Sequence, residues 1–187
     1  MNLFTSDRER RLWLWTLAVV MAIYSTLGLA RILAGALRDR GLLDGVFVFG
    51  MLLIIAAIVT QALKSWAGGA EIGGALGVAA VYLMLFARMA IPEERTHLIE
   101  YSVVAVFIFE ALKERMSQGH RVPVPALLAV FVTALIGVLD ECIQAFLPSR
   151  VFDPRDILFN VLAGLMAVTA SVALGWARRR GNQKASD

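Results

Sequence analysis

The chain has few of the residues from which soluble active sites and disulfide frameworks are usually built. Its 187 residues include one cysteine, Cys142, and two histidines, and only 18% of them are charged. A single cysteine excludes an internal disulfide and gives no indication of the redox compartment. The sequence also has no glycine-rich phosphate loop, P-loop or nucleophile elbow, so these signatures of nucleotide binding and of serine hydrolysis are missing.

Hydrophobic residues, in contrast, make up 59% of the chain, and the mean hydropathy is +0.71. Soluble domains use about half or fewer apolar residues, and a chain of this size and composition would have too little polar surface to stay in solution. The basic residues lie mostly between and outside the apolar runs, as in the loops of membrane proteins. We therefore expect an integral membrane protein, and no nucleic-acid partner despite the net charge of +3.

Six apolar runs predict an all-α, polytopic membrane helix bundle of about six transmembrane helices in one domain, residues 1–187. A spanning helix needs about 20 predominantly apolar residues, which most runs supply. The runs are Leu12–Leu37, Gly45–Leu63, Ile72–Met89, Thr96–Leu112, Pro123–Phe146 and Ile157–Trp176. The fourth is shorter, but Pro92 can begin its helix earlier. The first is longer than the apolar region of a cleaved signal peptide, so we expect it to remain as a span.

The distribution of lysine and arginine predicts that both termini lie in the cytoplasm. With six spans, 11 of the 18 basic residues fall on the side of the termini, and cytoplasmic loops carry the excess of positive charge. Residues 178–187 form a basic and polar tail after the last run. At the end of the fourth run, Glu110, Lys113 and Glu114 have spacings that permit local pairing, and we expect a solvated helix end there.

The same topology brings the polar residues of the last three spans to one face of the membrane. The fourth span starts at the exterior face, the fifth ends there and the sixth starts there. The residues so gathered are His97, Glu100, Tyr101, Asp140, Glu141, Gln144, Asp156 and Asn160. Ionisable side chains inside a membrane are costly and usually mark a functional site.

His97, Glu100 and Tyr101 follow one another at i, i+3 and i+4, so they share one face of the fourth helix. A histidine with a carboxylate neighbour can act as a general base near neutral pH. The alternative is an interfacial histidine that is hydrogen-bonded to a neighbouring helix.

Asp140 and Glu141 are adjacent carboxylates at the end of the fifth run. Two carboxylates close together in a low dielectric resist simultaneous ionisation, which suits one of them to proton transfer. Adjacent helical residues point about 100° apart, so we expect the helix to unwind before Pro148 if both face one site. The alternative is that these acids only join helices by pairing with arginines, which would be Arg88, Arg95 or Arg150.

The sixth helix is predicted to begin at Asp153-Pro154-Arg155-Asp156, with Asp153 as the N-cap and Pro154 in the first position. Asp156 either completes this first turn or faces the site with Asn160, one turn further on. Arg150 has the planar fork that suits a phosphate or carboxylate group, or it pairs with Glu141.

A metal site is less favoured by the sequence, and we assign no metal ligand. Histidine and glutamate three residues apart occur in carboxylate-bridged bundles, but here His97 precedes Glu100 and His120 is predicted on the opposite side of the membrane. The cofactor is not assigned, and a divalent cation is one candidate for it. Cys142 as a nucleophile is less favoured still.

Three motifs together resemble the VanZ-like family of bacterial membrane proteins, which is named after a teicoplanin-resistance accessory protein. They are Arg95-x-His97-x-x-x-Tyr101, Asp140-Glu141-x-x-Gln144, and Arg150-x-x-Asp153-x-x-Asp156-x-x-x-Asn160-x-x-x-Gly164. The resemblance covers about Arg88 to Trp176, so residues 90–177 are expected to be the family core and residues 1–89 additional spans. It implies a multi-pass protein of the bacterial cytoplasmic membrane, linked to low-level resistance to teicoplanin-like lipoglycopeptides, which act outside that membrane.

We therefore expect a VanZ-like protein that binds or modifies a lipid-linked or lipid-like anionic substrate at the extracytoplasmic face and contributes to glycopeptide (teicoplanin) resistance. The substrate is either a cell-envelope precursor or a lipoglycopeptide-related molecule. If it is an enzyme, the residues expected to carry acid–base chemistry are His97, Glu100, Asp140, Glu141 and Asp156. Those expected to hold the substrate are Arg95, Tyr101, Gln144, Arg150 and Asn160. The alternatives are a non-catalytic binding or assembly protein and a small transporter; the latter usually binds its substrate near mid-membrane. The oligomeric state is not assigned.

Overall fold

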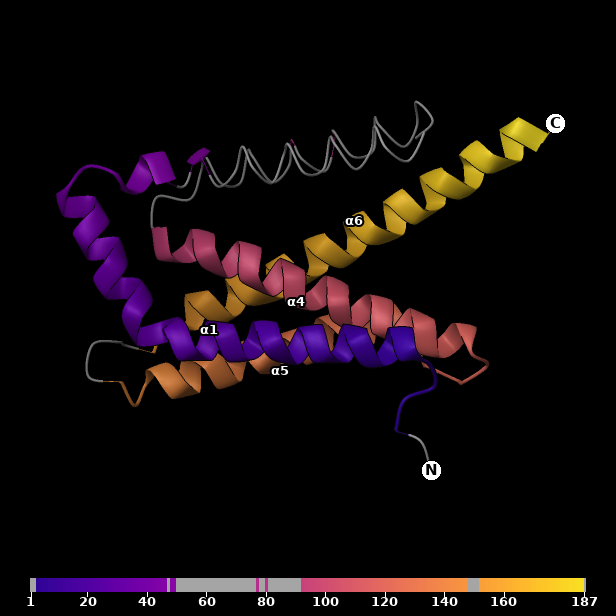
Figure 1. The fold of residues 1–187 in the computed structure, drawn as a ribbon, viewed down its shortest axis with the longest axis horizontal. Coiled ribbons are helices and arrows are strands. Elements are labelled where there is room, and N and C mark those ends of the chain that lie inside the picture. Colours follow the sequence, from indigo (N-terminus) through magenta and orange to yellow (C-terminus); the bar gives the residue numbers. More distant parts are fainter. Residues whose placement is uncertain are drawn as a thin grey trace. The chain divides into compact units, whose positions relative to one another are not determined.

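The computed structural model describes residues 3–46, 48–49, 77, 80, 92–147 and 152–186. The second and third predicted spans, Gly45–Leu63 and Ile72–Met89, lie almost entirely outside them. Four long helices are described: α1 (Asp7–Asp39), α4 (Pro92–Ser117), α5 (Pro125–Gln144) and α6 (Pro154–Ser186) (Figure 1). Every regular element within the described ranges is helical, which confirms the all-α class. As predicted, α4 begins at Pro92 and α6 at Pro154.

The chain divides into two compact units, of which the first contains the polar residues of interest. This unit comprises Met1–Ala30 and Ile91–Thr169, and the second comprises Arg31–Ala90 and Ala170–Asp187. In the second unit, α1 ends at Asp39 and is followed by Gly41 with φ of 66°, a left-handed conformation that glycine adopts without steric cost.

The first unit is a bundle in which consecutive helices run antiparallel. Glu9, near the start of α1, accepts a 3.2 Å bond from Arg115, near the end of α4. Asp153, just before α6, donates its backbone N–H to Glu141, near the end of α5. Between these ends, Tyr24 of α1 donates to the backbone carbonyl of Ile136 in α5 at 2.8 Å. In Figure 1 α1, α4 and α5 accordingly run alongside one another.

The interior of this bundle is packed by side chains from all four helices, many of them small. Its apolar core includes Ile23 of α1, Ala105 of α4, Ala129 of α5 and Ala167 of α6. At Gly164 of α6, a methyl group would lie 3.5 Å from the Thr133 side chain of α5 and 3.9 Å from that of Ala105 in α4. Small residues at the crossings let helices approach closely, which is how helices associate in membranes.

The outer surface of the bundle is apolar. On α5, Leu127, Phe131 and Leu135 are exposed at four-residue intervals, and Leu158 and Leu162 are exposed in the same way on α6. Residues Pro125–Gln144 and Pro154–Trp176 are long and apolar enough to cross a membrane, with a mean hydropathy of 2.2. Only 28% of each apolar window is buried, whereas the core helix of a soluble domain is mostly buried. These are two of the six predicted spans; six transmembrane helices stay a prediction.

At one end of the bundle, polar contacts join the start of α1 to the end of α4. Glu114 is buried and accepts bonds of 2.9 Å from the Ser6 hydroxyl and of 2.9 Å from the Arg8 guanidinium. The hydrogen bonds from Ser6 and Gln118 are the main causes that lower the pKa of Glu114 below its ordinary value. The expectation of a solvated helix end was therefore wrong for Glu114, because α1 covers it.

Candidate functional site

The opposite end of the bundle, where α4 and α6 begin and α5 ends, contains most of the polar residues singled out in the sequence. We call it the polar end and define it by His97, Tyr101, Asp140, Glu141 and Asp156. Four of these five side chains are buried, and Asp156 keeps 17% of its side-chain surface exposed. The antiparallel order of α4, α5 and α6 brings together residues that are far apart in the sequence.

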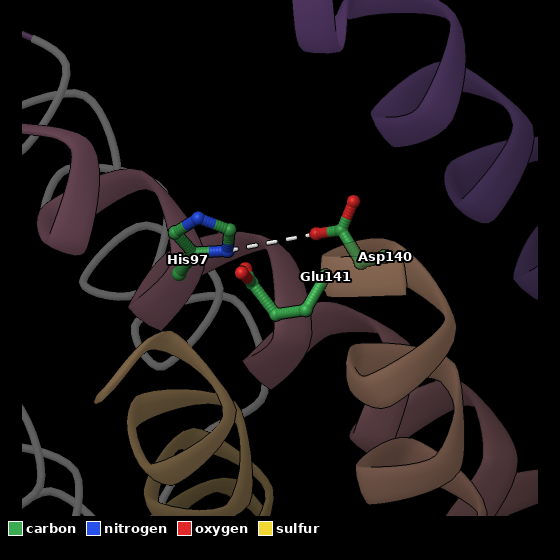
Figure 2. Close-up of side chains that lie close together, drawn as sticks. All are labelled: His97, Asp140 and Glu141. Carbon is green, nitrogen blue, oxygen red and sulfur yellow. Dashed lines mark ion pairs between the residues drawn. The ribbon is translucent and has the colours of Figure 1, made fainter. Parts of the chain in front are cut away.

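His97 lies between two carboxylates. Its Nδ1 atom is 3.8 Å from Oδ2 of Asp140, and its Nε2 atom is 3.8 Å from Oδ2 of Asp156. Figure 2 shows the imidazole of α4 facing the carboxylates of Asp140 and Glu141, which come from the last turns of α5. The two nitrogens of one ring thus face one fully buried and one partly exposed acid.

Asp140 is held from α4 as well. The hydroxyl of Tyr101 donates a 2.8 Å hydrogen bond to Oδ2 of Asp140, and both side chains are completely buried. The Tyr101 ring stacks on the His97 ring, with centroids 5.9 Å apart and planes 27° apart. The other carboxylate oxygen of Asp140, Oδ1, has no hydrogen-bond partner within the described part of the chain. A buried polar atom without such a partner is unusual and indicates a missing ligand or a strained site.

Both oxygens of Glu141 accept hydrogen bonds at the start of α6 and the end of α5. Gln144 donates its side-chain N–H to Oε1 at 3.1 Å, and the backbone N–H of Asp153 donates to Oε2 at 3.0 Å. The side chain of Asp153 accepts a 2.9 Å bond from the backbone N–H of Arg155, which confirms its predicted role as the N-cap of α6. The turn before α6 therefore fixes Glu141 in place.

The expectation that α5 must unwind for Asp140 and Glu141 to face one site was wrong. The helix is regular through Gln144, and both side chains are completely buried. The two side chains leave α5 in directions about 100° apart. Asp140 is buried against α4, where it accepts the bond from Tyr101, and Glu141 is buried against the start of α6, where it accepts the bond from the Asp153 backbone. Both carboxylates can then approach the space beside His97 (Figure 2).

His97, Asp140 and Glu141 form a cluster of three possible metal ligands. One ligand atom of each lies within 4.8 Å of those of the other two, and all three residues are buried. Glu100, the carboxylate that shares the helix face of His97 in the sequence, is not a member of this cluster and is only half-buried. The carboxylates that lie 3.8 Å from the His97 ring, those of Asp140 and Asp156, come from other helices.

Asn160 lies further along α6, where α5 approaches it closely. Its side chain is completely buried, and its amide nitrogen and oxygen have no hydrogen-bond partner among the described residues. A methyl group on Gly137 of α5 would come within 2.8 Å of the Asn160 side chain, so only glycine fits there. No sequence signal pointed to Gly137, since it stands in an apolar run without a turn or motif.

The structure thus brings together seven of the ten predicted site residues at or next to the polar end. They are His97, Tyr101, Asp140, Glu141, Gln144, Asp156 and Asn160. Glu100 is half-buried and is not one of the three possible metal ligands. The side chain of Arg95 and the whole of Arg150 lie outside the described residues. The hydrogen bond from the Asp153 backbone to Glu141 could not be predicted from the sequence, because every residue except proline has a backbone N–H.

The arrangement has the parts needed to move a proton between a buried and a more exposed group. The contacts run from the Tyr101 hydroxyl to Asp140, from Asp140 to one nitrogen of His97, and from the other nitrogen to Asp156. A buried carboxylate behind an imidazole orients the ring and stabilises its protonated form, as in hydrolase triads. Asp156 is the most exposed of these groups.

A family model described as VanZ/LLP1 matches residues 8–175. The match includes the first half of the chain, so the resemblance noted from about Arg88 onward was too short. Residues 8–89 lie inside the matched region, and their role as spans added to the core stays a prediction. Neither a curated protein nor a solved structure matches the chain.

Proposed function

The chain belongs to the VanZ/LLP1 family, and from that premise we propose that it is a multi-pass membrane protein that binds or modifies an anionic, lipid-linked or lipid-like molecule at the exterior face of the cytoplasmic membrane. VanZ-like proteins are linked to teicoplanin resistance, and we propose that this protein contributes to it. Lipid-linked precursors of the cell envelope are present at that face and carry phosphate groups.

The observation that supports this proposal best is the position of His97 between Asp140 and Asp156. Its two nitrogens are each 3.8 Å from a carboxylate oxygen, and the ring is buried at the end of an apolar bundle. A histidine placed only to join two helices needs one hydrogen-bond partner, whereas this ring faces an acid on each side. Such an arrangement suits a histidine that exchanges protons near neutral pH.

The apolar exterior and the helix directions support the proposed placement in the membrane. Exposed leucine and phenylalanine side chains on α5 and α6 suit contact with lipid, since contiguous apolar surface is rare on soluble monomers. The positive-inside bias puts the end that contains Arg8 and Arg115 in the cytoplasm. The polar end, which is the other end of the same bundle, then lies at the exterior face.

Arginine side chains complete the proposal as the groups that hold the anionic part of the substrate. Arg95 lies in the first turn of α4, two residues before His97, and Arg150 precedes the start of α6 by four residues in the sequence. A guanidinium group binds phosphate and carboxylate oxygens in pairs. We propose Arg95 and Arg150 for this role, with Tyr101, Gln144 and Asn160 orienting the bound group.

The test is the teicoplanin susceptibility of cells that express the protein. We expect His97→Asn and Asp140→Asn to reduce protection to the level of the empty vector, while His120→Asn, which changes the exposed second histidine, keeps it. The amount and detergent melting temperature of each variant in the membrane fraction are measured in parallel. Full protection by well-folded His97→Asn and Asp140→Asn variants would contradict the proposal.

The helix-joining alternative predicts a different pattern for the same variants. If the acids only hold α4, α5 and α6 together, loss of protection will follow loss of folded protein in every variant. Under the proposed function, Asp156→Asn loses protection without losing folded protein, because Asp156 is the least buried member of the set.

A further inference from the structure

We propose that His97, Asp140 and Glu141 bind a divalent transition-metal cation, with Zn²⁺ and Mn²⁺ as the best candidates. The inference deepens the proposed function and rests on it only for the identity of the substrate. Imidazole nitrogen and carboxylate oxygen together suit these cations, since imidazole favours Zn²⁺ and carboxylate favours Mn²⁺. Two carboxylates balance the charge of one divalent ion in a buried site.

The distances within the cluster fit a shared metal ion. Two ligands bonded to one Zn²⁺ at about 2.0–2.2 Å stand roughly 3–4 Å apart. The distance between His97 Nδ1 and Asp140 Oδ2 is 3.8 Å, which is too long for a hydrogen bond and falls in this range. All three ligand atoms lie within 4.8 Å of one another, so small side-chain movements would complete the coordination. Figure 2 shows the three groups directed toward the same space.

Each of the three ligands also has an outer partner of the kind that metal ligands have. A metal-bound histidine usually donates its other N–H to a carboxylate, and here Nε2 of His97 faces Asp156 at 3.8 Å, so a small movement of the ring would complete this contact. The Tyr101 hydroxyl donates to Asp140. The backbone N–H of Asp153 donates to Glu141. Such outer contacts orient ligands and are part of a metal site rather than an addition to it.

Asp140 provides an independent observation. Its side chain is completely buried, yet Oδ1 has no hydrogen-bond partner among the residues that the structure describes. Leaving a buried charged oxygen without a partner costs free energy, and a cation beside Asp140 removes this cost. The cluster is therefore more than a group of acids, because it combines a buried histidine with an unsatisfied buried oxygen.

Three protein ligands leave a coordination position open, which is typical of catalytic rather than structural zinc sites. An oxygen of an anionic substrate, or a water molecule, can take that position. A metal ion on Nδ1 of His97 would occupy the nitrogen that faces Asp140, and the proton exchange proposed above for the His97–Asp156 pair would then be carried out by Asp156. A phosphate or carboxylate of a lipid-linked molecule is the ligand that this chemistry would recognise.

The test uses the full chain, purified in detergent and stripped of metal with a chelator. Zn²⁺ or, in a separate titration, Mn²⁺ is added in competition with a chromogenic chelator, and bound metal is measured after gel filtration. We expect one Zn²⁺ per chain, and at least a tenfold weaker affinity in His97→Asn and in Glu141→Gln. His120→Asn and Cys142→Ser are the controls, since His120 and Cys142 are exposed residues that could bind Zn²⁺ adventitiously.

Circular dichroism establishes that the variants keep their helical content. If His97→Asn does not fold, Glu141→Gln still tests the site, because glutamine keeps the shape of the glutamate side chain. Binding of Zn²⁺ by the wild type and by both controls, with weaker binding in each cluster variant that keeps its fold, supports the site. Absence of Zn²⁺ and Mn²⁺ binding by the wild type overturns it. So does equal binding by wild type and Glu141→Gln.

The metal site and the proposed function can fail separately. A chain that binds Zn²⁺ through the cluster but confers no change in teicoplanin susceptibility supports the metal site and contradicts the proposed function. A chain that confers resistance but binds neither Zn²⁺ nor Mn²⁺ contradicts the metal site and leaves the proposed function standing.

Discussion

At the scale of single residues, Asp140 makes contacts that account for much of the geometry of the polar end. It accepts the hydrogen bond of Tyr101, faces His97, and lies next to Glu141 in the last turns of α5. A carboxylate that is completely buried in an apolar bundle is stable only if donors or cations compensate for the lost water. The Tyr101 hydroxyl is the donor whose contribution can be removed with the least change in shape.

We expect Tyr101→Phe to lower the free energy of unfolding by about 1–3 kcal/mol, because a buried carboxylate oxygen loses its donor. The measurement is the detergent melting temperature of the purified chain. Tyr24→Phe is the matched control: it removes a half-buried hydroxyl that donates to a backbone carbonyl, and it should cost only about 0.5–1.5 kcal/mol. Equal melting temperatures for Tyr101→Phe and the wild type would show that Asp140 does not depend on this bond.

At the scale of helices, the residues that cap and cross the elements decide how closely the polar groups approach. α4 ends at Ser117, and Gly119 follows with φ of 85°. The backbone N–H of Gly119 donates to the carbonyl of Met116, and that of His120 donates to the carbonyl of Arg115. This pattern is the one by which glycine commonly terminates helices. At the start of α6, the Asp153 cap both begins the helix and supplies the N–H that binds Glu141.

The crossing of α5 and α6 depends on Gly137, and Gly137→Ala tests it. The added methyl group would stand 2.8 Å from the Asn160 side chain, so one of the helices must shift. We expect a loss of about 1–3 kcal/mol in the free energy of unfolding, which is typical of overpacked cores, seen as a lower melting temperature in detergent.

Gly175→Ala is the control for Gly137→Ala. No described atom lies within 4 Å of a methyl group at Gly175 of α6, so the better helix propensity of alanine should stabilise the chain by up to about 1 kcal/mol. If Gly137→Ala were as stable as the wild type, the close contact with Asn160 would not be a constraint.

The sequence predicted these elements to different degrees, for physical reasons. The starts of α4 and α6 follow from Pro92 and from Asp153-Pro154, because proline and a capping side chain act locally. The burial of Glu114 and the need for glycine at 137 depend on which helix lies opposite, which local pattern does not contain. For the same reason the sequence paired His97 with Glu100, whereas the structure places Asp140 and Asp156 beside it.

At the scale of the whole molecule, the family match covers more of the chain than the motifs do. The VanZ/LLP1 match extends over residues 8–175, although the motifs recognisable in the sequence begin only near Arg88, because the polar residues of the first half are sparse and carry no motif. The structure orders the helices of the first unit as antiparallel neighbours, so the network around Glu114 and the polar end lie at opposite ends of one bundle. If the bundle crosses the membrane, these two ends face opposite sides of it.

The proposed function depends most on the polar end facing the exterior, and cysteine labelling tests this directly. In a Cys142→Ser background, Arg155→Cys places a thiol in the first turn of α6, and His120→Cys places one at the other end of the bundle; both positions are exposed. We expect a membrane-impermeant maleimide to label Arg155→Cys in intact cells and His120→Cys only after permeabilisation. Labelling of His120→Cys in intact cells, with Arg155→Cys protected until permeabilisation, would contradict the account.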